Sequence, residues 1–209
     1  MVSAADVARN ERSALCDAFT ELGPDAATLC EGWRTRDLAA HLVARESRPD
    51  AAIGLLIAPL ASHTDTVMRT IAAQPWPKLV QRVRSGPPMW SPMRALDGLA
   101  NLVEFTVHRE DVLRAQSGEH VEDRDEQTMS VLWQRLRSAA GLLFRRDAVV
   151  IDCPGFGQWQ SRLAASQDSV TLTGTPVDVL LTATGRSIGA HVSGSVDAVT
   201  AFNSRRRGI

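Results

Sequence analysis

Glu104 and His108, in the middle of the chain, carry side chains that could bind one metal ion. They lie in the segment EFTVHRED, and residues four apart lie above each other on one side of an α-helix. His41, which falls among the leucines of RDLAAHLVARES, could supply a third ligand from another helix. Two imidazole nitrogens and one carboxylate oxygen suit Zn²⁺ and other divalent transition metals. Three protein ligands leave one position open, as in catalytic zinc sites.

The spacing alone also fits simpler interpretations. A single inward histidine is more often a hydrogen-bonded core residue, and a Glu–His pair on a helix is more often a surface couple. Asp111, three residues beyond His108, could orient the imidazole, although the pattern favours a solvated charge at this position.

Other common sites are not indicated. The sequence has no GxGxxG, P-loop, GxSxG or HExxH motif, which argues against nucleotide binding and the commoner hydrolases. Cys16, Cys30 and Cys153 are far apart in the chain and have no evident partner histidine. A cysteine nucleophile is therefore not expected.

Amphipathic helices must position the candidate ligands. The central predicted helix begins at Ser91, a suitable N-cap, and ends at Gly118. Its apolar residues recur at three- and four-residue spacing and predict one buried stripe: Leu96, Leu99, Ala100, Val103 and Val107. The other predicted helices span residues 3–22, 36–47 with Thr35 as N-cap, 51–60, 64–73, 76–85 and 123–144.

The pattern changes after Arg146. The segment AVVIDC predicts a short strand at 148–153, and alternation with period two predicts another at 168–173, with a loop between them marked by Gly155 and Gly157. A helix should follow Thr175, then a strand at 190–193 and a last helix at 195–202. The prediction is thus a mainly α protein, with a four-helix bundle over residues 1–146 and a small α+β domain over residues 147–209.

Composition excludes several classes of protein. The 209 residues are 44% hydrophobic with a formal charge of −1, which predicts a globular protein that binds neither nucleic acid nor a membrane. The three cysteines do not predict a disulfide framework, and the N-terminus does not resemble a signal peptide, so we expect a cytoplasmic protein. The oligomeric state is open, with a homodimer as one option.

Two segments resemble a known family. EGWRTRDLAAHLVARE, followed some sixty residues later by EFTVHREDVLRA, resembles the mycothiol-dependent maleylpyruvate isomerase family. This family belongs to the DinB-like superfamily of metal-binding four-helix bundles. The resemblance places the metal ligands on His41, Glu104 and His108. It covers residues 1–146, and the remainder looks like the small C-terminal domain of such proteins.

The resemblance also implies a chemistry. It implies Zn²⁺ as the ion, mycothiol as a small-molecule thiol cosubstrate, an actinobacterial source, and a transferase or isomerase reaction on an unknown small substrate. It assigns no catalytic or cosubstrate-binding residue in this chain. The alternatives are a non-catalytic, metal-bearing module that binds a small ligand, and a hydrolase that uses zinc-bound water.

Overall fold

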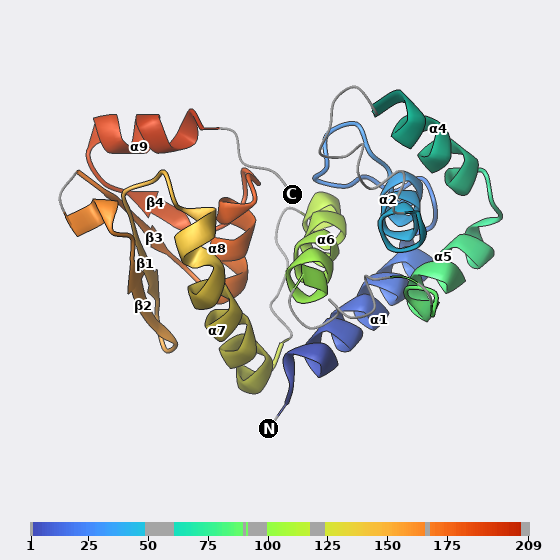
Figure 1. Cartoon of the computed structure of the whole chain (residues 1–209), viewed down its shortest axis with the longest axis horizontal. Helices are drawn as coiled ribbons and strands as arrows, with labels where there is room; N and C mark the ends of the chain where they lie inside the picture. The colour runs from blue at the N-terminus through green and yellow to red at the C-terminus, as the bar shows by residue number, and fades with distance from the viewer. Residues whose placement is uncertain are drawn as a thin grey trace. The chain divides into compact units, whose positions relative to one another are not determined.

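The computed structural model describes residues 2–48, 61–89, 91, 100–117, 124–165 and 168–205. By their contacts, the elements fall into two compact units, residues 8–122 and residues 1–7 with 123–209 (Figure 1). The predicted helix at 51–60 and the first turns of the predicted central helix lie outside the described residues.

The first unit is helical. It contains nearly all of α1 (Ala4–Leu22), followed by α2 (Thr35–Ser47), α4 (Ala61–Ala72), α5 (Trp76–Ser85) and α6 (Ala100–Ser117). Helix α2 packs beside α4 and α5. The described helices agree with the predicted ones to within a few residues.

Helix α2, which carries His41, begins differently from the prediction. Arg34 is the N-cap and Thr35 is the first helical residue. Asp37 Oδ2 accepts a hydrogen bond from the Arg34 backbone N–H at 2.9 Å, while the Thr35 hydroxyl donates to the Gly23 carbonyl at 2.6 Å. The threonine therefore ties the start of α2 to the first residue of the loop after α1 instead of capping the helix.

Large apolar side chains from four helices form the core of this unit. These are completely buried: Leu15, Phe19, Leu38, Leu42, Leu79 and Phe105. Burying a side chain of this size stabilises the fold by roughly 1.5–3 kcal/mol relative to leaving it exposed. The core therefore packs side chains of α2 and α6 into one cluster.

The prediction of a single apolar stripe on the central helix is wrong. From residue 101 to residue 112 of α6, every side chain except Val103 is buried. The helix is enclosed because Arg109 faces Glu11 of α1, Glu104 faces His41 of α2, and the Leu29 N–H donates to the Asp111 carbonyl. Because α6 has contacts on three sides, little of its surface is exposed to solvent.

The second unit combines helices with a four-stranded sheet. Helix α7 (Glu126–Leu143) is followed by β1 (Val149–Cys153), β2 (Gly157–Gln160), a 3₁₀ turn (Leu163–Ala165), β3 (Val170–Thr173), α8 (Pro176–Ala183), β4 (His191–Ser193) and α9 (Val196–Asn203). The strand order is β2-β1-β3-β4, with β1 parallel to β3 and both edge strands antiparallel. Helix α8 packs against α7.

Strand β2 replaces part of the predicted loop. Gly157 starts it with a φ of 139° and pairs with Cys153 of β1. The strand is only four residues long and has no buried side chain. It therefore lacks the apolar alternation by which strands are recognised in a sequence.

By its contacts, helix α7 belongs to the same compact unit as the sheet. The domain boundary predicted from the sequence lies after α7, at residue 146. That division concerns which segments form separate domains, and it stays a prediction. The described part of the chain contains no helix with the length and apolar character needed to cross a membrane.

Candidate metal centre

The three predicted ligands lie together in the first unit. His41 comes from α2, and Glu104 and His108 come from successive turns of α6. Glu104 Oε1 lies 3.2 Å from His41 Nε2 and 3.3 Å from His108 Nε2. All three residues are at most 9% exposed. The fold therefore brings two imidazoles to one carboxylate oxygen inside the helical unit.

The distances fit a small divalent ion. Two ligand atoms bound tetrahedrally at about 2.0–2.1 Å lie about 3.3 Å apart, close to the separations found here. His108 Nε2 is buried and lies 3.3 Å from Glu104 Oε1, but it makes no hydrogen bond of good geometry with a described residue. An ion between these atoms would satisfy this nitrogen, so the donor set fits the predicted group.

The surroundings hold Glu104 in its charged form. Burial opposes its ionisation, but hydrogen bonds from His108 and His41, together with the charge of Arg45, keep its pKa well below the ordinary value. Burial lowers the pKa of His41, so this imidazole is neutral and able to bind an ion near neutral pH.

His108 differs because it lies between two carboxylates. Burial opposes a charge on the ring, yet hydrogen bonding to Asp111, Cys30 and Glu104 raises its pKa well above the ordinary value. Without an ion, the ring thus holds an extra proton on the side of Glu104. A cation at Nε2 can replace this proton.

Two further side chains border the candidate ligands. Arg45 Nε lies 3.5 Å from Glu104 Oε1, and its Nη1 donates to Asn101 Oδ1 at 2.6 Å. The ring of Trp33 lies 5.2 Å from that of His41 at a tilt of 48°. Trp33 covers one side of the imidazole, and Arg45 adds positive charge beside the carboxylate.

The sequence-based interpretation of Asp111 as a solvated charge is wrong. Its side chain is fully buried, and its Oδ2 accepts a hydrogen bond from His108 Nδ1 at 2.9 Å. A carboxylate at this nitrogen fixes the orientation of the ring and leaves Nε2 directed toward Glu104. The other interpretation, that Asp111 orients His108, agrees with this geometry.

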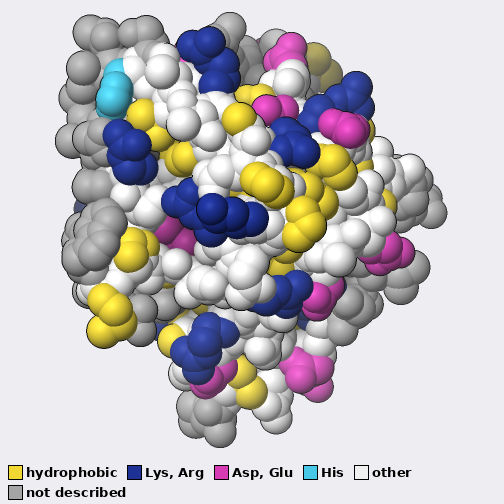
Figure 2. All heavy atoms as spheres, turned by 90° about the vertical axis from the view of Figure 1, so that its right-hand side faces the viewer, with side chains coloured by type: hydrophobic (Ala, Val, Ile, Leu, Met, Phe, Trp, Pro, Cys, Tyr) yellow, Lys and Arg dark blue, Asp and Glu magenta, His cyan; other side chains and the backbone are white. Residues whose placement is uncertain are grey.

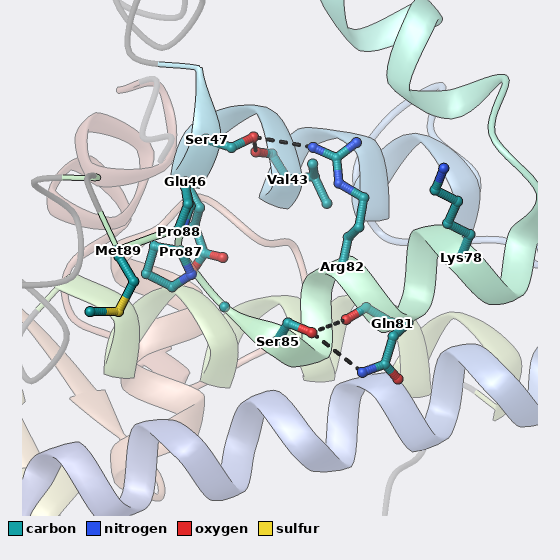
Figure 3. Close-up of a pocket in the computed structure, with 11 residues that line it drawn as sticks. Val43, Glu46, Ser47, Lys78, Gln81, Arg82, Ser85, Pro87, Pro88 and Met89 are labelled. Carbon is teal, nitrogen blue, oxygen red and sulfur yellow. Dashed lines mark hydrogen bonds between the residues drawn. The ribbon is translucent and has the colours of Figure 1, made fainter.

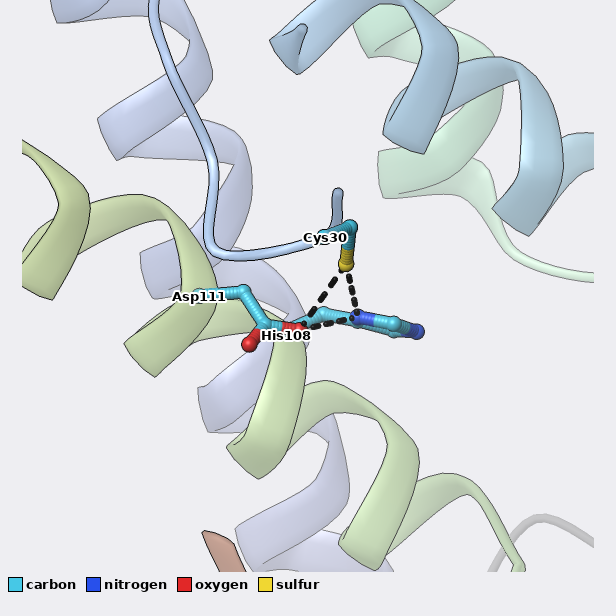
Figure 4. Close-up of side chains that lie close together, drawn as sticks. All are labelled: Cys30, His108 and Asp111. Carbon is cyan, nitrogen blue, oxygen red and sulfur yellow. Dashed lines mark hydrogen bonds and ion pairs between the residues drawn. The ribbon is translucent and has the colours of Figure 1, made fainter. Parts of the chain in front are cut away.

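Cys30 is the neighbour that sequence reasoning missed. Its Sγ lies 3.2 Å from Asp111 Oδ2 and 4.0 Å from His108 Nδ1, so it does have a histidine nearby (Figure 4). The loop after α1 brings it there, because the Leu29 N–H donates to the Asp111 carbonyl at 2.9 Å. Cys30 and His108 are 78 residues apart, and no local pattern could have paired them.

A hollow of about 500 Å³ lies between the end of α2 and helix α5 (Figure 3). Lys78 and Arg82 line it with Ser47 and Gln81, and Arg82 donates to the Ser47 hydroxyl at 3.4 Å. None of the three candidate ligands lines this hollow. The hollow is therefore separate from the three candidate ligands.

Basic side chains do not gather into a single patch on the face drawn in Figure 2. Lys and Arg side chains occur there in several places, separated by apolar and acidic ones. Of the remaining histidines, His63 and His191 are exposed. His120 lies outside the described residues.

Comparisons with known proteins support the fold. No protein-family model matches the sequence, and no curated protein matches it. Two crystal structures match, those of the mycothiol-dependent maleylpyruvate isomerase and of a mutant of it. The mutant aligns with a TM-score of 0.61 and 16% identity, and the unmutated enzyme with 0.59 and 15%. Both alignments cover 95% of this chain and 98% of the other. The chain is thus a distant structural relative of that isomerase, with a mainly helical fold and a small sheet.

Proposed function

We propose that this protein is a metal-dependent enzyme with a low-molecular-weight thiol, mycothiol, as cosubstrate in a transferase or isomerase reaction. His41, Glu104 and His108 would hold the ion, for which Zn²⁺ fits best. The observation that carries the proposal is the meeting of these three side chains at 3.2 and 3.3 Å around Glu104 Oε1. The structural likeness to an enzyme described as mycothiol-dependent supports the choice of thiol.

The charge of the donor set favours an anionic partner. One carboxylate and two neutral imidazoles leave a divalent ion with a net charge of +1. When bound, such an ion promotes loss of the proton of a coordinated thiol, which is then present as the nucleophilic thiolate near neutral pH. A site of three protein ligands has room for that fourth ligand.

The neighbouring residues prepare the ligands. Asp111 keeps the proton of His108 on Nδ1, so that the lone pair of Nε2 faces the ion. Arg45 keeps Glu104 ionised, and Trp33 shields His41 from water on one side. The ligands are therefore oriented by contacts within the fold.

Metal and thiol binding can be tested with the Co²⁺-loaded protein. The Cys30→Ser variant is the right background, because the thiol of Cys30 could itself give a sulfur-to-cobalt charge-transfer band. We expect a visible Co²⁺ spectrum and a charge-transfer band that saturates as mycothiol is added. His41→Ala in the same background should lose both. A Co²⁺ spectrum that no thiol alters would refute thiol binding.

Turnover separates the enzyme from the alternatives. Maleylpyruvate, the substrate in the name of the structural neighbour, is the first compound to try, with and without mycothiol. Thiol-dependent conversion of maleylpyruvate, or of another small electrophile, supports the enzyme. Thiol-independent ester or amide hydrolysis would favour the zinc-water hydrolase, and thiol binding without turnover of any substrate would favour the binding module.

A further inference from the structure

We propose that Cys30, Asp111 and His108 form a second cation site, on the Nδ1 side of the His108 ring, that takes a thiophilic divalent ion such as Cd²⁺ or Zn²⁺. The three donors are a sulfur, a carboxylate oxygen and an imidazole nitrogen, all within 4.8 Å of one another. They point toward one another from α6 and the loop after α1 (Figure 4). This site does not depend on His41 or Glu104.

The separations suit tetrahedral coordination. With a metal–sulfur bond of about 2.3 Å and metal–nitrogen and metal–oxygen bonds of about 2.0–2.1 Å, sulfur should lie about 3.5 Å from the other donors, which should be about 3.3 Å apart. The observed values are 3.2 Å from Cys30 Sγ to Asp111 Oδ2, 4.0 Å from Cys30 Sγ to His108 Nδ1 and 2.9 Å from His108 Nδ1 to Asp111 Oδ2. A shift of about half an ångström by the sulfur, and of about 0.4 Å between the carboxylate oxygen and the ring nitrogen, would match these values.

The loop that carries Cys30 is held in place. The Cys30 N–H donates to the Thr28 hydroxyl at 3.2 Å, and this hydroxyl donates to the Trp33 carbonyl at 2.9 Å. The Leu29 N–H donates to the carbonyl of Asp111 itself. The sulfur is thus fixed beside Asp111 by backbone contacts on both sides, which lowers the entropic cost of gathering the ligands.

The charges of the two sites differ. A thiolate and a carboxylate together balance a divalent ion, so the second complex is neutral and can remain buried without another anion. The first site would keep a net charge of +1 and attract one. Sulfur also makes the second site softer, which favours Cd²⁺ and Zn²⁺ over harder ions.

The shared ring allows one ion at a time. Binding at Nδ1 releases the thiol proton and the Nδ1 proton of the doubly protonated ring, and the remaining imidazole proton is then on Nε2. Glu104 Oε1, 3.3 Å away, can accept a hydrogen bond from that nitrogen. Binding at Nε2 requires the opposite tautomer, in which Asp111 holds the proton. A neutral His108 therefore serves one site or the other.

Titration of the His41→Ala variant with Cd²⁺ tests the second site apart from the first. We expect an ultraviolet thiolate-to-cadmium charge-transfer band that saturates at one equivalent. His41→Ala with Cys30→Ser should lose the band, whereas His41→Ala with Cys16→Ser should keep it, since Cys16 is buried in the core beside α5. Absence of the band in His41→Ala, or its persistence without Cys30, would overturn the inference.

Alkylation of Cys30 gives a second measurement, made first on the unmodified protein. Burial raises the thiol pKa of Cys16 to about 11 and that of Cys153 to about 12, so half-exposed Cys30 should react first with iodoacetamide. Saturating Cd²⁺ should slow alkylation of Cys30 at least tenfold. An unchanged rate, both here and in the His41→Ala variant that lacks a ligand of the first site, would refute the second site and leave the Co²⁺ and thiol results of the first site untouched.

Discussion

The two units of the molecule differ in the ionisable side chains that they bury. Among the described residues, helices α1, α2 and α6 of the first unit bury a group of ionisable side chains: Glu11, Arg12, His41, Glu46, Glu104, His108, Arg109, Glu110 and Asp111. The described part of the sheet unit buries one carboxylate, that of Asp147, and is otherwise apolar or hydroxyl-bearing inside. An isolated buried charge costs several kcal/mol, so each one in the first unit needs a partner.

Most of these charges have a partner of opposite charge. Arg12 donates to both carboxylate oxygens of Glu46, at 2.9 and 2.5 Å, and Arg114 contacts Glu110 at 2.6 Å. Glu104 differs, because its nearest neighbours are two imidazoles and its arginine is 3.5 Å away. Buried charges that pair with each other therefore build the first unit, whereas a buried carboxylate between two histidines marks the candidate site.

Breaking a structural pair should have the largest effect. Arg12→Ala leaves Glu46 buried without its cation and also removes the guanidinium packed 4.1 Å from the Phe105 ring. We expect a loss of about 3–5 kcal/mol in the free energy of unfolding, measured by urea denaturation. Arg84→Ala is the matched control, because it breaks the exposed Arg84–Asp17 pair, which joins α5 to α1, and should cost about 1 kcal/mol or less. Equal losses would show that burial does not distinguish the pairs.

A cavity in the sheet unit should destabilise the fold without touching the site. Leu172 of β3 is completely buried between two neighbouring strands. Leu172→Ala should lower the free energy of unfolding by about 2–5 kcal/mol. Co²⁺ affinity at a temperature where the variant is folded should stay the same, since no candidate ligand lies in this unit. A fall in Co²⁺ affinity that matches the loss of stability would contradict the expectation that the sheet unit takes no part in metal binding.

Removing the negative charge of Glu104 should weaken metal binding and should not affect folding. Glu104→Gln keeps the shape of the side chain but loses the anionic ligand, so we expect Co²⁺ affinity to fall about 100-fold, or about 2.7 kcal/mol. Competition with a chromophoric chelator would measure this. Glu110→Gln, at a buried carboxylate of the same helix paired with Arg114, should leave Co²⁺ affinity nearly unchanged. Similar affinities for both variants would exclude Glu104 as a ligand.

The smallest effect is expected at a helix cap of the sheet unit. Thr175 caps α8, where its hydroxyl accepts from the Asp178 N–H at 3.1 Å. Thr175→Ala should cost about 1 kcal/mol of stability by thermal or urea unfolding, whereas Thr175→Ser, which keeps the hydroxyl, should cost only a few tenths. Co²⁺ binding should be the same in both variants and in the unmodified protein.

Local periodicity determined most of the elements and part of the site. The spacing of Leu38, His41 and Leu42 places the histidine on the buried side of α2, and the interval between Glu104 and His108 is one turn of α6. Helical geometry alone fixes both relations, because each depends on residues three or four apart. For the same reason strand β3 follows from alternation with period two.

Only the tertiary structure determined the features that depend on contacts between distant segments. It enclosed α6 on several sides, so that Asp111 is buried at His108 instead of solvated, and it placed Cys30 beside Asp111 across 81 residues. It also made a strand of the exposed segment Gly157–Gln160, whose pairing with β1 depends on backbone hydrogen bonds. Sequence periodicity reports which side of an element is apolar. Which other element covers that side, and which polar groups meet there, depends on packing between distant segments.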